Sequence, residues 1–295
     1  GSANLIGGRG VVLRPLPTRG GRAMRFPGAP ETVKMACGEN PKRVYGEKGG
    51  PQTRMGNLRG QREAFLAALD RKEAYEAPTE RKKPPPDPPP PDLDGDTLVG
   101  LLRGEFLAQV HCYRADDMVS FLQLADEVGF RVRSFHHAVE AYKIRDLLAE
   151  REVAVSTWSD WWGFKMESYD AVLPNLAMVA SAGGRAVVHS DSPEGIQRLN
   201  QEAGKAWRDG QDAGFDVSED EALRWITANP AWVLGIERET GTLEVGKRGD
   251  VVVWDHHPFS VYARARWVFI DGRLVHDASD PEVWSDFELG LEVSR

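Results

Sequence analysis

The stretch Arg185-Ala-Val-Val-His-Ser-Asp-Ser-Pro193 decides the fold prediction for this sequence. Its small and β-branched residues end abruptly at His189, Asp191 and a proline, which indicates a buried strand whose end carries an imidazole and a carboxylate. In a parallel α/β barrel the catalytic groups lie at the carboxyl ends of the strands. The alternative is an ordinary strand followed by an Asp/Ser cap of the next helix.

The pattern of strand followed by helix recurs along most of the chain. We expect strands over residues 31–38, 106–112, 131–135, 152–156 and 186–189. We expect helices over residues 59–76, 98–103, 115–129, 141–150, 175–182, 194–209 and 218–229. Strands that alternate with helices in this way predict βαβ units, so the fold class is α/β with a parallel sheet.

The two ends of the chain follow different patterns. Residues 1–30 are predicted to be mostly loop with one short strand over 11–13, and residues 39–46 are predicted to be a loop. From Gly241 the sequence favours short strands, and Asp271-Gly272 is a strong hairpin signal. The predicted domains are therefore residues 1–240, with a proline-rich polyproline II excursion over 81–92, and residues 241–295.

Composition restricts the function classes. The chain has 295 residues and a net charge of −8, which argues against a general nucleic-acid binder. It has no run of about 18 apolar residues, so no membrane span is predicted and a soluble protein is expected; the compartment, cytoplasmic or periplasmic and secreted, stays open. Cys37 and Cys112 are predicted to be free buried thiols, with a single bridge as the alternative. The first two residues, Gly1-Ser2, are either a tag remnant or the start of a processed product.

Side chains that bind metals follow several of the predicted strands. Lys34 lies in the first strand, His111 ends the second, His136 and His137 end the third, and Asp191 ends the last. Imidazoles and carboxylates that meet at one rim are suitable ligands for Zn²⁺ or a similar divalent ion. A single buried histidine is more often a core residue than a ligand. The prediction of a metal site therefore depends on several strands ending in a residue that can bind a metal.

Five motifs of the chain resemble the amidohydrolase superfamily, most closely its imidazolonepropionase-like and prolidase-like branch. They have the sequences VHCYRADD at 110–117, HAVEAYK at 137–143, HSDSP at 189–193, TANPAWVLG at 227–235 and GTLEVGKRGD at 241–250, and the resemblance as a whole extends from about Lys34 to Asp277. The resemblance implies a (β/α)8 TIM barrel, of which this chain supplies roughly strands 4–8, together with part of a small β-sandwich.

The resemblance also implies a set of roles for the strand-end residues. His111, His137 (rather than His136) and Asp191 match metal ligands, and Asp191 also matches the general base and acid. Lys34 matches the lysine that, when carboxylated, bridges two metals in binuclear relatives; the alternative is a strand lysine with its amine at the rim. A divalent metal, zinc by expectation, would then activate a hydroxide that cleaves an amide, peptide or cyclic amide C–N bond.

Several residues are predicted to contact the substrate. Tyr113 matches a tyrosine that holds a substrate carboxylate in prolidase-like relatives. Arg114, Lys42, Arg43 and Tyr45 would add to an anion pocket, or else they are loop residues at the surface. His189 lies two residues before the catalytic aspartate, on the same face of the strand.

One part of the superfamily pattern is missing. The seven histidines include no His-x-His pair, which in the superfamily ends the first barrel strand. Five strands cannot close a barrel, and their edges would be exposed. We therefore expect a partner, either a separate N-terminal chain or a cleaved fragment that carries His-x-His, in a hetero-oligomer that acts on a small molecule or peptide. The competing hypothesis is a non-catalytic scaffold or binding subunit derived from an amidohydrolase.

Overall fold

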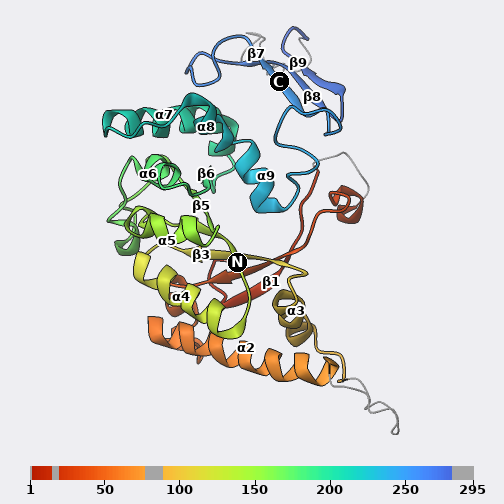
Figure 1. The fold of residues 1–295 in the computed structure, drawn as a ribbon, viewed down its shortest axis with the longest axis vertical. Coiled ribbons are helices and arrows are strands. Elements are labelled where there is room, and N and C mark those ends of the chain that lie inside the picture. Colours follow the sequence, from red (N-terminus) through yellow and green to blue (C-terminus); the bar gives the residue numbers. More distant parts are fainter. Residues whose placement is uncertain (1, 15–19, 77–88, 281–295) are drawn as a thin grey trace, which may run out of the picture.

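The computed structural model describes residues 2–14, 20–76 and 89–280 (Figure 1). Short 3-10 turns separate some of the elements. The strands are β1 (Ile6–Gly10), β2 (Thr32–Ala36), β3 (Leu107–Cys112), β4 (Val132–His137), β5 (Ala154–Thr157), β6 (Ala186–Val188), β7 (Val251–Trp254), β8 (Ala265–Ile270) and β9 (Arg273–Asp277). The α-helices are α1 (Glu39–Tyr45), α2 (Arg54–Glu76), α3 (Leu93–Leu102), α4 (Ala115–Val128), α5 (Arg145–Glu150), α6 (Asn175–Ser181), α7 (Leu199–Asp212), α8 (Glu219–Arg224) and α9 (Ala228–Leu234).

The larger sheet has the order β1-β2-β3-β4-β5-β6. Strands β2 to β6 are parallel neighbours in chain order, and β1 pairs antiparallel with β2 at one edge. Strands β3, β5 and β6 are buried along nearly their whole length, as expected for a parallel sheet that is covered on both faces. The predicted α/β class with a parallel sheet is confirmed.

Helices that follow the parallel strands cover the sheet. Figure 1 shows α2, α4, α5, α6 and α7 stacked along one side of it. The predicted stop of the helix that begins at Ala115 is confirmed, because Gly129 caps α4 in the left-handed conformation with φ 87°. The main core lies between these helices and the sheet, and its largest fully buried side chains include Trp225, Phe65, Phe121 and Phe135.

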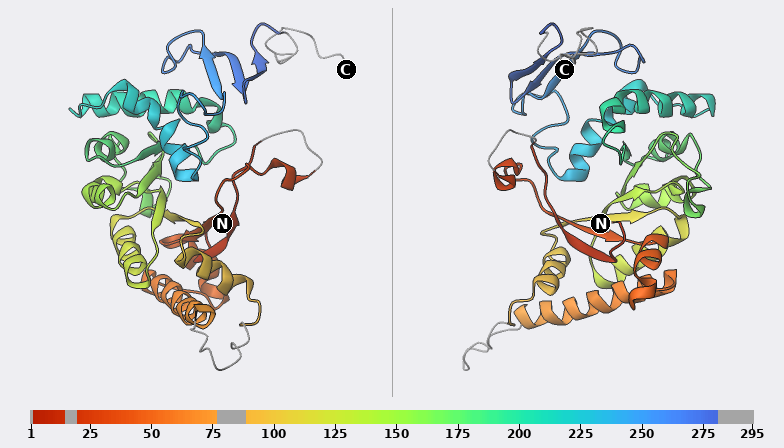
Figure 2. Two further views of the ribbon diagram at one scale, coloured as in Figure 1. Left: turned by 45° about the vertical axis from the view of Figure 1, so that its right-hand side comes forward. Right: turned by 180° about the vertical axis from the view of Figure 1, so that it is seen from behind.

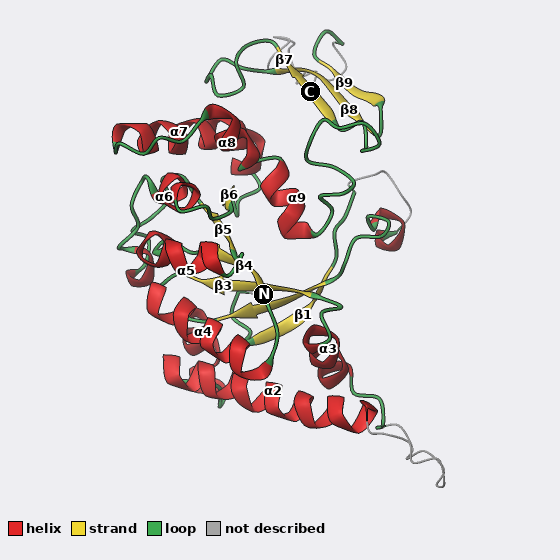
Figure 3. Cartoon of the chain, viewed as in Figure 1, coloured by secondary structure: helices red, strands yellow, loops and turns green. Residues whose placement is uncertain are grey.

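A second sheet, β7-β8-β9, is antiparallel. The predicted hairpin turn is confirmed, since Asp271 and Gly272 lie between the paired residues Ile270 and Arg273 and both have positive φ. Figures 2 and 3 show this sheet as a separate layer at the end of the molecule beyond α8 and α9. Within the described part of the chain, no helix is long and apolar enough to cross a membrane.

Three local predictions were wrong. The N-terminal strand is Ile6–Gly10 rather than 11–13, because backbone pairing with β2 decides its position. Most of residues 39–46 form helix α1 (Glu39–Tyr45) instead of a loop; Pro41 falls in its first turn, where a missing N–H breaks no helical hydrogen bond. The helix expected over 218–229 is two helices, since Pro230 places a new first turn at α9. Residues 81–88 of the proline-rich segment lie outside the described residues.

The prediction of free thiols was also wrong. Cys37 and Cys112 form a disulfide with their Cα atoms 5.2 Å apart. Ala36 pairs with His111 in the parallel β2–β3 register, so the next residue of each strand stands beside its neighbour. A separation of this size is typical of a bridged pair.

Candidate functional site

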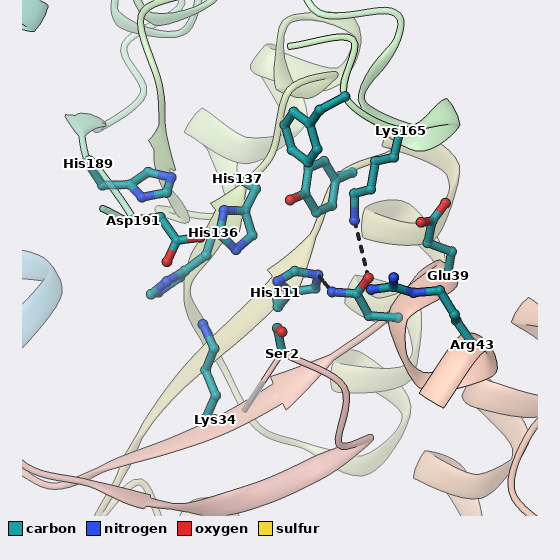
Figure 4. A pocket seen from close by; sticks show the side chains of 13 residues that line it. Ser2, Lys34, Glu39, Arg43, His111, His136, His137, Lys165, His189 and Asp191 are labelled. Atoms are coloured by element: carbon teal, nitrogen blue, oxygen red, sulfur yellow. Dashed lines mark hydrogen bonds between the residues drawn. The ribbon is translucent and has the colours of Figure 1, made fainter. Parts of the chain in front are cut away.

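A cavity of about 470 Å³ opens above the carboxyl ends of the parallel strands (Figure 4). Figure 4 shows Asp191 and His189 on one side of it, Glu39, Arg43 and Lys165 on the other, and His111 and His137 between them. The residues that line it are Ser2, Lys34, Glu39, Asn40, Arg43, His111, Tyr113, His136, His137, Phe164, Lys165, His189 and Asp191.

The strand register brings the histidines together. His111 of β3 is paired with His136 of β4, and His137 follows at the end of the same strand. A regular strand would point His137 away from His136, but its φ of 73° departs from extended backbone. Its ring centroid lies 4.4 Å from that of His111. A left-handed backbone at this strand end therefore lets neighbouring imidazoles reach one cavity.

Asp191 also has a left-handed backbone, with φ 49°, three residues after β6 ends. Non-glycine residues adopt this conformation rarely, and such conformations gather at functional sites. Among the residues that the structure describes, two of the five non-glycine residues with positive φ are thus His137 and Asp191, both of which line the cavity. The strand end predicted from sequence to carry chemistry is where the backbone departs from regular geometry.

Hydrogen bonds fix the orientation of His111. The ammonium of Lys165 donates to Asn40 Oδ1 at 3.3 Å, so the amide nitrogen of Asn40 faces His111 Nε2 at 3.1 Å. Because that amide nitrogen can only donate, Nε2 accepts and the ring proton of neutral His111 lies on Nδ1.

A second amide orients His136 in the opposite sense. Gln109 donates its amide hydrogen to the carbonyl of Val233 at 2.9 Å. Its Oε1 therefore accepts from His136 Nε2 at 2.7 Å, which leaves Nδ1 of His136 without the proton.

Burial keeps the imidazoles neutral. It lowers the pKa of His111 to about 3, helped by the charges of Lys165 and Lys34, and it lowers the pKa of His189 to about 3, helped by Lys34. The pKa values of His136 and His137 are held well below the ordinary range for the same reason. Neutral imidazole is the form that binds a metal.

Lys34 also departs from ordinary behaviour. Burial lowers the pKa of its amine to about 8, although the charge of Asp191 acts in the opposite direction. A large part of this lysine is therefore neutral near pH 8. Burial has the opposite effect on Tyr113, whose pKa it raises, so the phenol stays protonated and can donate.

The donor atoms fit a metal ion in part. His111 Nδ1, His137 Nδ1 and His189 Nε2 are buried and have no hydrogen-bond partner among the described residues. Buried imidazole nitrogens without partners are expected where a ligand binds. As they stand, however, residues 2–14, 20–76 and 89–280 contain no group of three or more His, Cys, Asp or Glu side chains arranged to hold a metal ion.

The cavity contains most of the residues predicted from sequence. Lys34, His111, Tyr113, His137, His189 and Asp191 all line it. Arg114 does not, because its guanidinium pairs with Asp116 at 2.9 Å. Tyr45 lies at the end of α1, outside the lining, and its hydroxyl donates to Asn4.

Of the opposite wall, the sequence predicted only Arg43. Asn40 and Lys165 were not singled out, although they bond to each other and Asn40 bonds to His111. Asn40 lies in the first turn of α1, shortly after strand β2 ends. A prediction of helix for residues 39–46 would have placed it near the strand ends that carry the other site residues. Lys165 follows a tryptophan-rich loop and reaches the cavity only through tertiary structure.

A buried carboxylate attaches this loop to the barrel. Glu167 has a 1% exposed side chain and accepts from Arg54 at 3.0 Å, Lys165 at 2.8 Å and the Glu39 backbone at 2.8 Å. Gly38 makes the approach possible, because a Cβ there would lie 2.6 Å from Glu167 Oε2. The loop after β5 thereby becomes part of the cavity wall.

Comparisons with known proteins agree on one family. A family model described as "Amidohydrolase family" matches residues 163–276. The chain is similar to amidohydrolase tasK of Hapsidospora irregularis, with 31% identity over 311 residues, which cover 97% of this chain and 30% of tasK. It thus spans less than a third of that relative.

Solved structures show the same similarity. An amidohydrolase from Thermotoga maritima MSB8 superposes with a TM-score of 0.79 and 32% identity, over 94% of this chain and 70% of that one. An adenosine deaminase from Xanthomonas campestris with bound zinc has a TM-score of 0.51 and 17% identity, over 88% of this chain and 63% of that one, and it shows likeness of fold alone.

Proposed function

We propose, from the premise that this chain belongs to the amidohydrolase superfamily, that it carries the base-bearing part of a metal-dependent hydrolase active site. The reaction is hydrolysis of an amide, peptide or cyclic amide C–N bond. The observation that carries the proposal is the convergence of Asp191, Lys34 and three buried imidazole nitrogens without partners on one cavity.

A divalent metal is part of the proposal. His111, His137 and Asp191 would hold it, with Lys34 as a further ligand once carboxylated, and zinc is the expected ion. When bound, such an ion polarises a carbonyl and makes hydroxide available near neutral pH. The neutral state of the histidines and the unpartnered Nδ1 of His137 support this assignment; His111 would bind through Nδ1 as its other tautomer, with its ring proton on Nε2.

Asp191 is the proposed general base and acid. Its carboxylate takes a proton from the attacking water and delivers it to the leaving nitrogen, so the amine departs neutral. The left-handed backbone at Asp191 supports this role, because it projects the carboxylate beyond the strand end into the cavity.

Tyr113 and His189 complete the proposed substrate-contacting set. Tyr113 stays protonated and stacks on His137 with ring centroids 5.0 Å apart, so its hydroxyl is a donor beside the reacting group. His189 lies 5.1 Å from His137 between ring centroids and lines the same cavity. These groups orient the carbonyl and exclude bulk water.

A segment outside this sequence is proposed to complete the site. The parallel sheet has only five strands in chain order, and β6 has no further neighbour among the described strands. This chain covers 70% of the Thermotoga maritima relative, so part of that relative lies outside the matched region. We propose that a separate N-terminal chain or fragment carries the His-x-His pair and forms a hetero-oligomer with this one.

The test is reconstitution of the complete protein. It is purified with every associated chain, its zinc content is measured, and dipeptides, N-acyl amino acids and cyclic amides are screened for hydrolysis. We expect at least one metal ion per site and hydrolysis that a chelator abolishes. Absence of both metal and hydrolysis from the complete assembly would favour the non-catalytic scaffold instead.

A further inference from the structure

The wall of the cavity opposite Asp191 carries charges that the proposed chemistry does not use. Figure 4 shows Glu39 and Arg43, both from α1, beside Lys165 on this side. All three line the cavity. Their pairing with other residues decides which of them is free to meet a substrate.

Lys165 belongs to a closed network of ion pairs. Glu167 pairs with Lys165 at 2.8 Å and with Arg54 at 3.0 Å, and Arg54 also pairs with Asp117 at 2.8 Å. Two cations and two anions balance in this group. Lys165 therefore brings no unbalanced charge to the cavity, and its ammonium lies 3.8 Å from the centre of the Tyr113 ring.

Glu39 and Arg43 are different. They lie four residues apart on one helix, a spacing at which a glutamate and an arginine usually pair. Neither the Glu39 carboxylate nor the Arg43 guanidinium forms a hydrogen bond or ion pair with any residue that the structure describes. The cavity wall thus presents one anion and one cation, each without a partner there.

We propose that this pair recognises a zwitterionic substrate, an amide that carries a free ammonium group and a free carboxylate; the proposal rests on the proposed function. Glu39 binds the ammonium group and Arg43 the carboxylate. One negative and one positive charge on the wall are complementary to a zwitterion. A dianion would be repelled by the Glu39 carboxylate, and a dication would be repelled by the Arg43 guanidinium. Phe164 and Tyr113 add apolar surface to the lining of the same cavity. A cavity of about 470 Å³ suits a ligand of this size.

The experiment uses the complete zinc-loaded protein. Binding is measured by calorimetry for the ketomethylene analogue of leucyl-leucine, which cannot be hydrolysed, and for its N-acetylated, C-amidated and doubly blocked forms. We expect each block to weaken binding roughly 10- to 100-fold, because each removes one charged partner. Equal dissociation constants for the unblocked and the doubly blocked analogues would overturn the proposal, whether or not any amide is hydrolysed.

Two variants assign the charges. Glu39→Gln should make the dissociation constant of the N-acetylated analogue equal to that of the unblocked one and leave the effect of C-amidation unchanged. Arg43→Gln should do the same for the C-amidated analogue and leave the effect of N-acetylation unchanged. Lys48→Gln and Glu73→Gln, at exposed positions away from the cavity, are the matched controls and should preserve both. If either variant weakens binding of all the analogues alike, the assignment of one charge to each residue is contradicted.

A further arm identifies the source of the zwitterion. Hydrolysis of leucyl-leucine is compared with that of Nε-acetyl-lysine, in which both charges lie on the same side of the amide. If the enzyme hydrolyses one of these two compounds faster, and blocking the charges of that compound removes the preference, the proposal is supported and the substrate is identified. If the blocked amides are hydrolysed with the same kcat/KM as the unblocked ones, the proposed hydrolase activity is supported and recognition of a zwitterion is refuted.

Discussion

The amide of Asn40 lies between Lys165 and His111, 3.3 Å from the Nζ of the first and 3.1 Å from the Nε2 of the second. Since Lys165 can only donate, this arrangement sets the ring proton of His111 on Nδ1, the atom without a partner among the described residues. Gln109, whose amide nitrogen donates to Val233, likewise sets the ring proton of His136 on Nε2.

Neighbouring histidines should therefore be opposite tautomers in the metal-free protein. Nitrogen-15 NMR of the imidazoles should show an Nδ1–H form for His111 and an Nε2–H form for His136. Lys165→Met frees the Asn40 amide to rotate and should mix the tautomers of His111 while His136 stays unchanged. Identical tautomers for both rings in the original protein would contradict the hydrogen-bond assignment.

Asp191→Asn should lower kcat of the reconstituted enzyme by about 100- to 10,000-fold, because the amide cannot accept the proton of the attacking water. The folded structure should persist, since Asp191 is exposed and makes no described side-chain hydrogen bond. Steady-state kinetics and thermal unfolding measure the two effects. Asp160→Asn, at a surface ion pair with Lys205, is the matched control and should retain activity.

Lys34 should react with carbon dioxide at a lower pH than an ordinary lysine. The neutral amine attacks carbon dioxide to give a carbamate and release a proton, and the pKa of about 8 makes that amine available. With ¹³C-bicarbonate, a carbamate carbon signal should grow between about pH 7 and about pH 9. Lys34→Arg should remove the signal; a signal that survives in this variant would place the carbamate elsewhere.

Stability should fall in mild acid. The pKa values of His111 and His189 are depressed to about 3 in the folded chain, so below the unfolded value of 6.5 the unfolded chain binds more protons. This contribution is fully present above pH 6.5 and is lost as the pH falls towards 3. Each histidine adds a slope approaching about 1.4 kcal/mol per pH unit. Urea unfolding over this range measures it, and His189→Gln should flatten the dependence.

Reduction should destabilise the protein. The Cys37–Cys112 bridge closes a loop across a sequence separation of 75 residues, for which chain entropy gives about 4 kcal/mol. Denaturant unfolding with and without a reductant measures the difference. Thiol titration of the unfolded, unreduced chain should find no free thiol; two free thiols would restore the prediction made from sequence.

The sequence alone determined the α/β class with a parallel sheet, the hairpin at Asp271-Gly272 and the strand-end positions of His111, His137 and Asp191. These follow from local patterns, because apolar runs, helix stops and turn residues act within a few positions of the chain. The resemblance to amidohydrolases came from the same short motifs.

Tertiary structure decided what those patterns do not encode. The disulfide required the register of β2 against β3, and the helical state of Glu39–Tyr45 placed Glu39, which the sequence did not single out, on the cavity wall beside Arg43. Lys165 reached the cavity because Glu167 holds its loop against Arg54 and Gly38. Contacts between residues more than a hundred positions apart depend on packing, which no local periodicity specifies.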